Sequence, residues 1–150
     1  IKKMAIKILG NGVEVRKPGF AYNGAIIAGK AVTLDSSDIS GQTIKVAGAS
    51  DIVLGLALET TVAPLTNWFN YDDYNRGGLV TAVSGSGFEV EVFDDGRGPV
   101  FDTAQSYAIN DKIYVGANGV LTNQSGGQEI GFVTKAPATA TDSLKIQINL

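Results

Sequence analysis

The chain has 150 residues, of which 44% are hydrophobic and 18% are charged, so it can bury a sizeable core as one domain and is not disordered. Its formal net charge is −3, its 19 glycines are close to twice the ordinary share of about 7%, and it contains neither cysteine nor histidine. The lack of thiol and imidazole groups excludes cysteine and Ser-His nucleophiles, dithiol redox chemistry and the usual structural zinc sites.

The N-terminal segment differs in charge from the rest of the chain. Five basic side chains against Glu14 alone give residues 1–17 a charge of +4, whereas residues 18–150 hold 7 basic and 14 acidic side chains, or −7. We expect a basic N-terminal arm over residues 1–17 and a single β domain over residues 18–150. The arm could bind an acidic protein surface or be a solvated terminus. The acidic body argues against nucleic-acid binding, which needs a basic stripe to displace counterions.

Alternation of apolar and polar residues is the dominant period along the chain, and it indicates strands with one buried face. It is clearest at residues 13–16, 88–92 and 144–150, and further short β-rich runs lie at residues 31–34, 43–46, 52–58, 113–115, 120–122 and 130–134. The strand at 52–58 is apolar nearly throughout, which favours burial on both faces. Short strands at about 8–12-residue spacing predict an all-β fold, a small barrel or sandwich of short antiparallel strands with an extended N-terminal arm.

Turn residues between the C-terminal strands predict how these strands connect. Asn118-Gly119 between apolar residues is a strong hairpin signal, and Ser125-Gly126-Gly127 follows the next short run. Residues 111–137 are therefore expected to form a meander of at least three strands.

Two halves of the sequence echo each other. Residues 30–33 followed by 53–58 resemble residues 112–115 followed by 129–133, with an offset of 82 at Lys30 and Lys112 and of 76 at the glycines. The fold could thus consist of two pseudo-repeated halves, although short β patterns also repeat by accident.

An aromatic segment at about residues 64–78 interrupts the alternation and is expected to be an insertion loop. It carries Trp68, Phe69, Tyr71 and Tyr74 within seven residues. Large rigid rings anchor interfaces or stack on sugars, and they also plug the ends of barrels. Both interpretations, contact surface and plug, stay open.

Catalytic and cofactor sites have little support in the sequence. Asp72-Asp73 and Asp94-Asp95 are the only adjacent carboxylate pairs, and neighbouring residues in a strand point apart, so they are expected to be loop and turn residues. Gly85-Ser86-Gly87 lacks the third glycine and the following helix of a dinucleotide loop.

No apolar run approaches the ~18–20 residues that span a bilayer, and no cleavable leader is visible, so we expect no membrane association and no secretion. We expect no cofactor, and a carboxylate-based hydrolase is a minor alternative.

The order of several weak motifs resembles the small capsid cement or decoration proteins of tailed bacteriophages. These motifs are the runs at residues 31–34, 51–59, 110–115, 119–122 and 130–133, followed by the alternating C-terminal strand. The resemblance covers about residues 28–150. The chain departs from the family pattern at Asn110, where glycine is commoner, and in the aromatic insertion.

The resemblance implies a structural virion protein, not an enzyme, that binds the major capsid protein on the outer surface of an expanded phage head and stabilises it, often as a homotrimer. The arm would then lie on the capsid or add a strand to a neighbouring sheet. The alternative is a glycan- or receptor-binding β module of a phage tail, fibre or cell surface. The expected capsid or subunit contacts are Lys2, Lys3, Ile6, Lys7, Ile8, Val13, Val15, Arg16, Lys17, Trp68, Phe69, Tyr71 and Tyr74.

Overall fold

The computed structural model describes residues 6–10, 12–61, 79–93, 98–139 and 142–150, and within them the chain is all-β, as predicted. The aromatic segment, both adjacent carboxylate pairs and the first two lysines lie outside the described residues. The strands are β1 (Ile6–Leu9), β2 (Val13–Tyr22), β3 (Ala31–Leu34), β4 (Thr43–Val46), β5 (Gly55–Ala57), β6 (Val80–Val92), β7 (Lys112–Val115), β8 (Leu121–Thr122), β9 (Glu129–Lys135) and β10 (Leu144–Asn149), and one 3-10 turn, η1 (Ala117–Gly119), joins β7 to β8.

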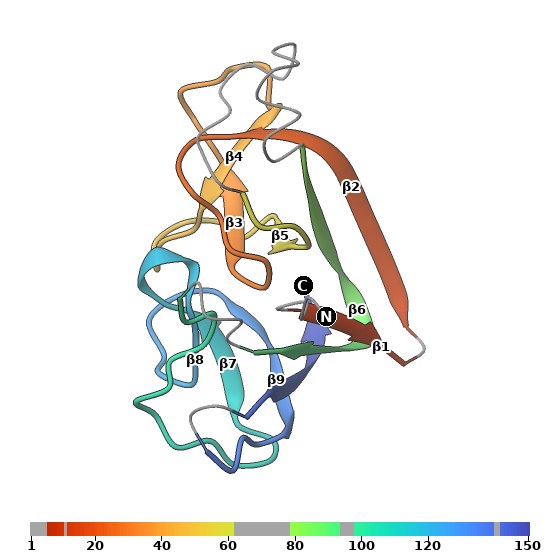
Figure 1. Cartoon of the computed structure of the whole chain (residues 1–150), viewed down its shortest axis with the longest axis vertical. Coiled ribbons are helices and arrows are strands. Elements are labelled where there is room, and N and C mark those ends of the chain that lie inside the picture. The colour runs from red at the N-terminus through yellow and green to blue at the C-terminus, as the bar shows by residue number, and fades with distance from the viewer. Residues whose placement is uncertain (1–5, 11, 62–78, 94–97, 140–141) are drawn as a thin grey trace.

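Five strands close into a small barrel. β2 pairs with β4, β4 with β3, β3 with β5, β5 with β6, and β6 again with β2, so the ring has no free edge where it closes (Figure 1). All of these pairs are antiparallel except β2 with β4, which is parallel. A compact core cluster includes Tyr22, Val32 and Ile44 of these strands and Ile26 of the β2–β3 connection. The barrel forms the N-terminal half of the fold.

The long strand β6 connects the barrel to the second half. Along one edge, β2 pairs with its first part, Val80 to Ser86, and β1 pairs with its last part, Glu89 to Val92. Along the other edge, β5 pairs with Ala82 and Val83, and β10 pairs with Ser86 and with Glu89 to Val92. From β10 the sheet continues through β9 and β7 to β8, in the lower part of Figure 1. The two halves therefore share one strand.

The pairing in the C-terminal half differs from the predicted meander. β7 lies at the centre and pairs with both β8 and β9, and no pairing joins β8 to β9 among the described strands. The far edge of β8 is already occupied, because Leu121 donates its N–H to Val100 O at 2.9 Å and accepts from Asp102 N at 2.8 Å. The Asn118-Gly119 hairpin between β7 and β8 is confirmed, and both residues have positive φ.

The internal repeat is present in the backbone. Strands β4-β3-β5-β6 and β8-β7-β9-β10 have the same order and the same antiparallel pairings. Gly29 N donates to Ala57 O, and Asn110 N donates to Val133 O, both at 2.8 Å. Gly29 and Asn110 also share positive φ, 100° and 72°. The first strands of the halves are thus offset by 81 residues, which corrects the offset of 82 obtained by matching lysines.

The main hydrophobic core fills the space between the halves. Ala31, Leu56 and Val83 of the barrel strands belong to one buried cluster with Phe88, Ile113, Ile130 and Ile146 of the rest of the fold. Of residues 52–58, predicted to be buried on both faces, only Gly55–Ala57 form the strand β5, and all three are buried, whereas Ile52 is 82% exposed. One face of the barrel is therefore covered by the second half of the same chain.

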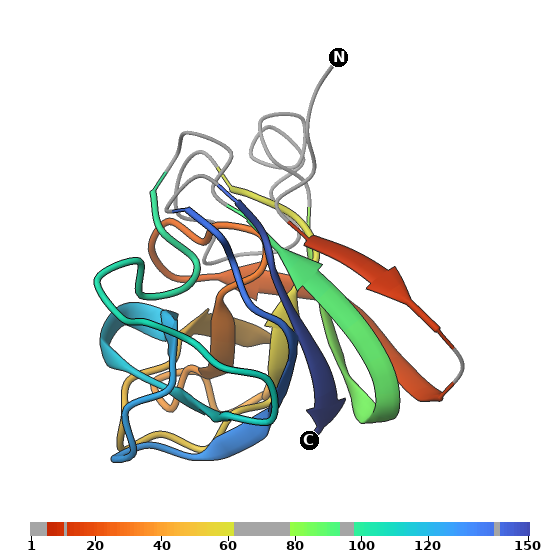
Figure 2. The same ribbon diagram turned by 90° about the horizontal axis from the view of Figure 1, so that it is seen from below.

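The N-terminal strands run along one edge of β6 and bend with it. β1 and β2 pair with successive parts of β6, and β6 bends sharply where its partner changes from β2 to β1 (Figure 2). Glycines permit this corner: a β-carbon at Gly12 would overlap the backbone at Phe88, and one at Gly85 would overlap the carbonyl oxygen of Val13. The Gly-Ser-Gly run in β6 is thus part of a sheet corner.

Candidate interaction surface

Residues 13–17 of β2, which pair with residues 86–82 of β6, form an exposed outer strand at the corner of the sheet, which we call the corner ribbon (Figure 2). Val13 lies opposite Ser86 and Val15 opposite Ser84. Residues 13–17 are all exposed, with Val13 at 66% and Val15 at 40%. A strand that alternates apolar and polar residues normally buries one face, so the exposed valines mark a surface suited to a partner.

The opposite face of the corner ribbon is charged. Arg16 forms an ion pair with Glu14 on the same strand; the Arg16 side chain is exposed and that of Glu14 is partly exposed. Exposed pairs of this kind contribute little to stability, about 0–1 kcal/mol, so these charges are available to a partner at small cost. Lys17 and, on β1, Lys7 add exposed positive charge on either side of the corner.

The predicted contact residues of the arm separate into two groups. Ile6 is buried at 1% exposure in the main core, and Ile8 is half-buried and packs against it. Lys7 and the residues of the corner ribbon are exposed. The side chain of Ile6 therefore packs within its own chain and is not on the surface. The two N-terminal lysines and the four aromatic residues lie outside the described residues, and their roles stay predictions.

The arm is paired within its own chain. Residues 6–9 and 13–17 bond to β6, and β2 continues without interruption past residue 17, the expected boundary of the body. Among the described strands, residues 6–9 and 13–17 have no second partner. A neighbouring chain that adds a strand would have to pair at this outer edge.

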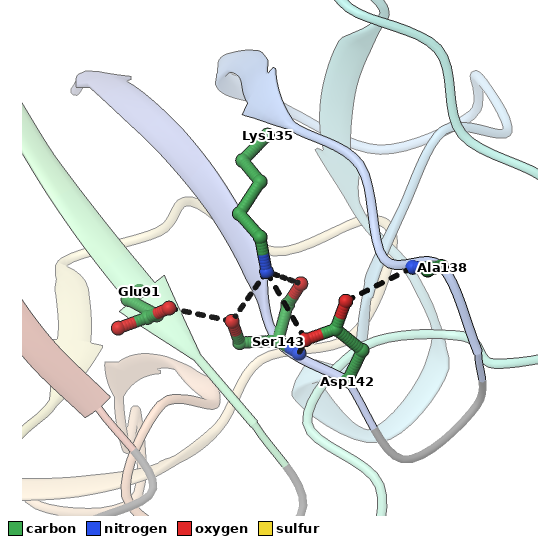
Figure 3. Close-up of polar contacts among 5 residues, drawn as sticks. All are labelled: Glu91, Lys135, Ala138, Asp142 and Ser143. Atoms are coloured by element: carbon green, nitrogen blue, oxygen red, sulfur yellow. Dashed lines mark hydrogen bonds and ion pairs between the residues drawn. The ribbon is translucent and has the colours of Figure 1, made fainter.

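A polar cluster joins the ends of β6, β9 and β10 and contains a serine beside a lysine (Figure 3). Lys135 Nζ donates to Asp142 Oδ1 at 3.1 Å and to Ser143 Oγ at 3.0 Å, and Ser143 Oγ donates to Glu91 Oε2 at 2.5 Å. The backbone N–H of Ala138, followed by that of Ser143 and the Lys135 ammonium group, lowers the pKa of Asp142 to about 2.

This cluster has the contacts of a structural clamp. A nucleophilic serine needs a neighbouring base with a free lone pair. The ammonium group of Lys135 donates to Ser143 instead, and its charge is compensated by Asp142. The contacts hold the β9–β10 connection against β6.

In the described part of the chain no group of three or more acidic side chains could hold a metal ion, and no helix there is long and apolar enough to cross a membrane.

The sequence predicts Val13, Val15, Arg16 and Lys17 as contacts but not the bend of the sheet beside them, because alternation identifies strands and not their curvature. The available signal was the distribution of glycines. Gly10 and Gly12 precede β2, and Gly85 and Gly87 lie at the matching level of β6. Paired glycines in two long strands are typical of a bend in a two-stranded ribbon.

The fold has a solved counterpart over nearly its whole length. The crystal structure of the head fiber gp8.5 N base of bacteriophage phi29 matches with a TM-score of 0.58 and 12% sequence identity, covering 91% of this chain and 95% of that chain. At this identity the likeness is one of fold. No family model and no curated protein matches the chain, so membership of the capsid cement family stays a prediction.

Proposed function

We propose that this chain is a structural, non-enzymatic protein of a phage head that attaches to the outer surface of the expanded capsid through the major capsid protein. The observation that carries this proposal is the likeness of nearly the whole chain to the N base of a phage head fiber. The order of motifs in the sequence points to the same kind of protein independently of the fold.

The corner ribbon is the proposed contact with the capsid. It lies on the outer edge of β6 at the corner of the sheet and exposes Val13 and Val15 beside Arg16 and Lys17. Burying the two valines against the shell would supply the hydrophobic part of the binding energy, about 1.5–3 kcal/mol for a fully buried side chain. The basic residues favour an acidic capsid surface and raise the rate of encounter.

Attachment as a trimer near local three-fold positions would stabilise the shell. Each subunit of a trimer brings its own corner ribbon, so the second and third contacts form at high effective concentration and weak single contacts add to a firm one. A trimer that persists in solution should bury well over ~1,000 Å² between subunits. Sedimentation equilibrium of the free protein measures this directly.

Binding to phage heads tests the proposal. Purified protein is mixed with expanded heads that lack it, the heads are sedimented, and bound copies are counted. We expect saturation at a copy number that matches the local three-fold positions. Failure of the folded protein to bind any head position would contradict the proposed function.

Two pairs of matched variants test the corner ribbon. Val13→Asp with Val15→Asp should weaken head binding at least about tenfold, because two apolar contacts are lost and charge is buried in their place. Ile39→Asp with Ile52→Asp is the control, since both isoleucines are exposed and lie in the β3–β4 and β4–β5 connections. Equal loss of binding in both pairs would show that the corner ribbon is not the contact.

A further inference from the structure

The internal repeat reveals a sheet face that is covered in one half and open in the other. Ala31 and Leu56 of the barrel are completely buried against the second half. Their equivalents in the repeat are Lys112 and Phe132, which pair with each other in the same way. Lys112 is exposed and Phe132 is only half-buried. The outer face of β7 and β9 therefore has no covering neighbour among the described residues.

A polar hollow lies beside this open face. It has a volume of about 400 Å³, within the range of about 300–1,000 Å³ of small-molecule sites. The residues that line it are Asp111, Lys112, Tyr114, Asn123, Gln124 and Ser125. It thus combines one aromatic ring with a carboxylate, two amides and a hydroxyl group.

Two of the polar side chains are held in place by their own hydrogen bonds. Asp111 Oδ2 accepts from Ala108 N at 2.9 Å, and Asn123 Nδ2 donates to Ser106 O at 2.8 Å. Asp111 Oδ1 and the hydroxyl group of Tyr114 have no hydrogen-bond partner among the described residues. Fixed groups with free hydrogen-bonding capacity lose little entropy when they bind a ligand.

The charge in the hollow favours an uncharged ligand. The ammonium group of Lys112 lies 3.6 Å from Glu129 Oε1, and these two groups together with Asp111 carry a net charge of −1. A phosphate or another anion would be repelled by Asp111. A carboxylate and two amides accept and donate several hydrogen bonds to hydroxyl groups, and the tyrosine ring offers an apolar surface beside them.

A second hollow, also of about 400 Å³, continues from the first. The two share Gln124, and the rest of the second lining is Pro99, Asp102, Thr103, Gly116, Ala117, Val120 and Thr122, which is more apolar but includes one carboxylate. A ligand that extends across Gln124 would meet a polar part followed by a more apolar one. This arrangement suits a chain of linked rings with hydroxyl groups on their rims and apolar faces.

We propose that the two hollows form a binding site for a neutral oligosaccharide. One sugar ring stacks on Tyr114, its hydroxyl groups bond to Asp111, Asn123 and Gln124, and a second ring extends toward Val120. This function is separate from capsid attachment, because the site lies on the C-terminal half and contains no residue of the corner ribbon.

Titration of the folded full chain with neutral trisaccharides tests the site. Maltotriose, cellotriose and tri-N-acetylchitotriose are added to about 10 mM while ¹H–¹⁵N NMR spectra are recorded, with the anionic sialyllactose for comparison; this range covers dissociation constants near 1 mM. We expect saturable shifts confined to the linings of the two hollows, residues 99–103, 111–117 and 120–125, with at least one neutral sugar. Sialyllactose should bind more weakly than that sugar.

Variants separate stacking from general surface effects. Tyr114→Ala should weaken binding about 5- to 10-fold through loss of the ring contact. Gln124→Ala changes an exposed side chain and should weaken binding about threefold while leaving the fold intact. Lys45→Ala, in β4 of the barrel, is the control and should change nothing.

Three results would overturn the proposal: no saturable shift with any neutral trisaccharide, shifts elsewhere on the chain, or affinity unchanged by both Tyr114→Ala and Gln124→Ala. Sialyllactose binding as tightly as the neutral sugars would overturn the assignment of an uncharged ligand. The same variants should leave the binding of phage heads unchanged, so failure of one proposal is distinguishable from failure of the other.

Discussion

Single glycines decide where the sheet turns its corner. Gly85 has φ of 126°, and a β-carbon there would overlap the carbonyl oxygen of Val13. We expect Gly85→Ala to lower the free energy of unfolding by at least about 2 kcal/mol, from backbone strain and the clash together. Gly24→Ala is the control, because Gly24 also has positive φ but has open space around it, and it should cost about 1 kcal/mol. Urea unfolding of the two variants measures the difference, and equal losses would contradict the steric argument.

At the scale of elements, the connection between β3 and β4 is held by two carboxylates, Asp35 and Asp38, each of which accepts three side-chain or backbone hydrogen bonds. The side chain of Ser40, then that of Thr43, then the backbone N–H of Ser40 donate to Asp38 and lower its pKa from 3.8 to about 2. A lowered pKa in the folded state means that the carboxylate stabilises the fold above about pH 4. This contribution is lost as the pH falls from about 4 toward 2.

The pH dependence of this connection is measurable residue by residue. Carboxyl ¹³C NMR should give a pKa for Asp38 near 2. The amide signals of Ser40 and Thr43 should change over the same pH range. Asp38→Asn should remove that pH-dependent change, whereas the amide of Ser143, which donates to Asp142, should keep its own. A midpoint for Asp38 near 3.8 would show that the hydrogen bonds do not persist in solution.

At the scale of the whole molecule, the shared strand and the shared core predict that the two halves unfold together. Leu56 is completely buried and belongs to the core cluster that also contains Phe88 and Ile130. Leu56→Ala should therefore lower the free energy of unfolding by about 2–5 kcal/mol and shift the transition of both halves equally. Urea unfolding followed by NMR signals of Val32 and Val115 checks this. Separate midpoints for the two signals would show that the halves unfold independently. Ile39→Ala, at an exposed position, is the control.

Much of the fold was readable from local pattern. Alternation identified the strand at residues 144–150, and the apolar run around residue 56 gave a strand buried on both faces. The hairpin at Asn118-Gly119 followed from turn chemistry, since both residues adopt positive φ. The repeat was also visible, but matching lysines gave the wrong offset, because the equivalent positions are defined by backbone hydrogen bonds at Gly29 and Asn110 and not by side chains.

The sequence by itself determined the all-β class, the absence of thiol and imidazole chemistry and the turns, because these depend on composition and on neighbouring residues. Only the tertiary structure decided which strand faces are covered. Ile6 and Val13 both lie in segments where apolar and polar residues alternate, yet Ile6 lies in the core and Val13 on an exposed outer strand. Leu56 is buried by the second half, while its repeat equivalent Phe132 is left partly open. Burial depends on contacts between residues far apart in the chain, and local pattern carries no information about them.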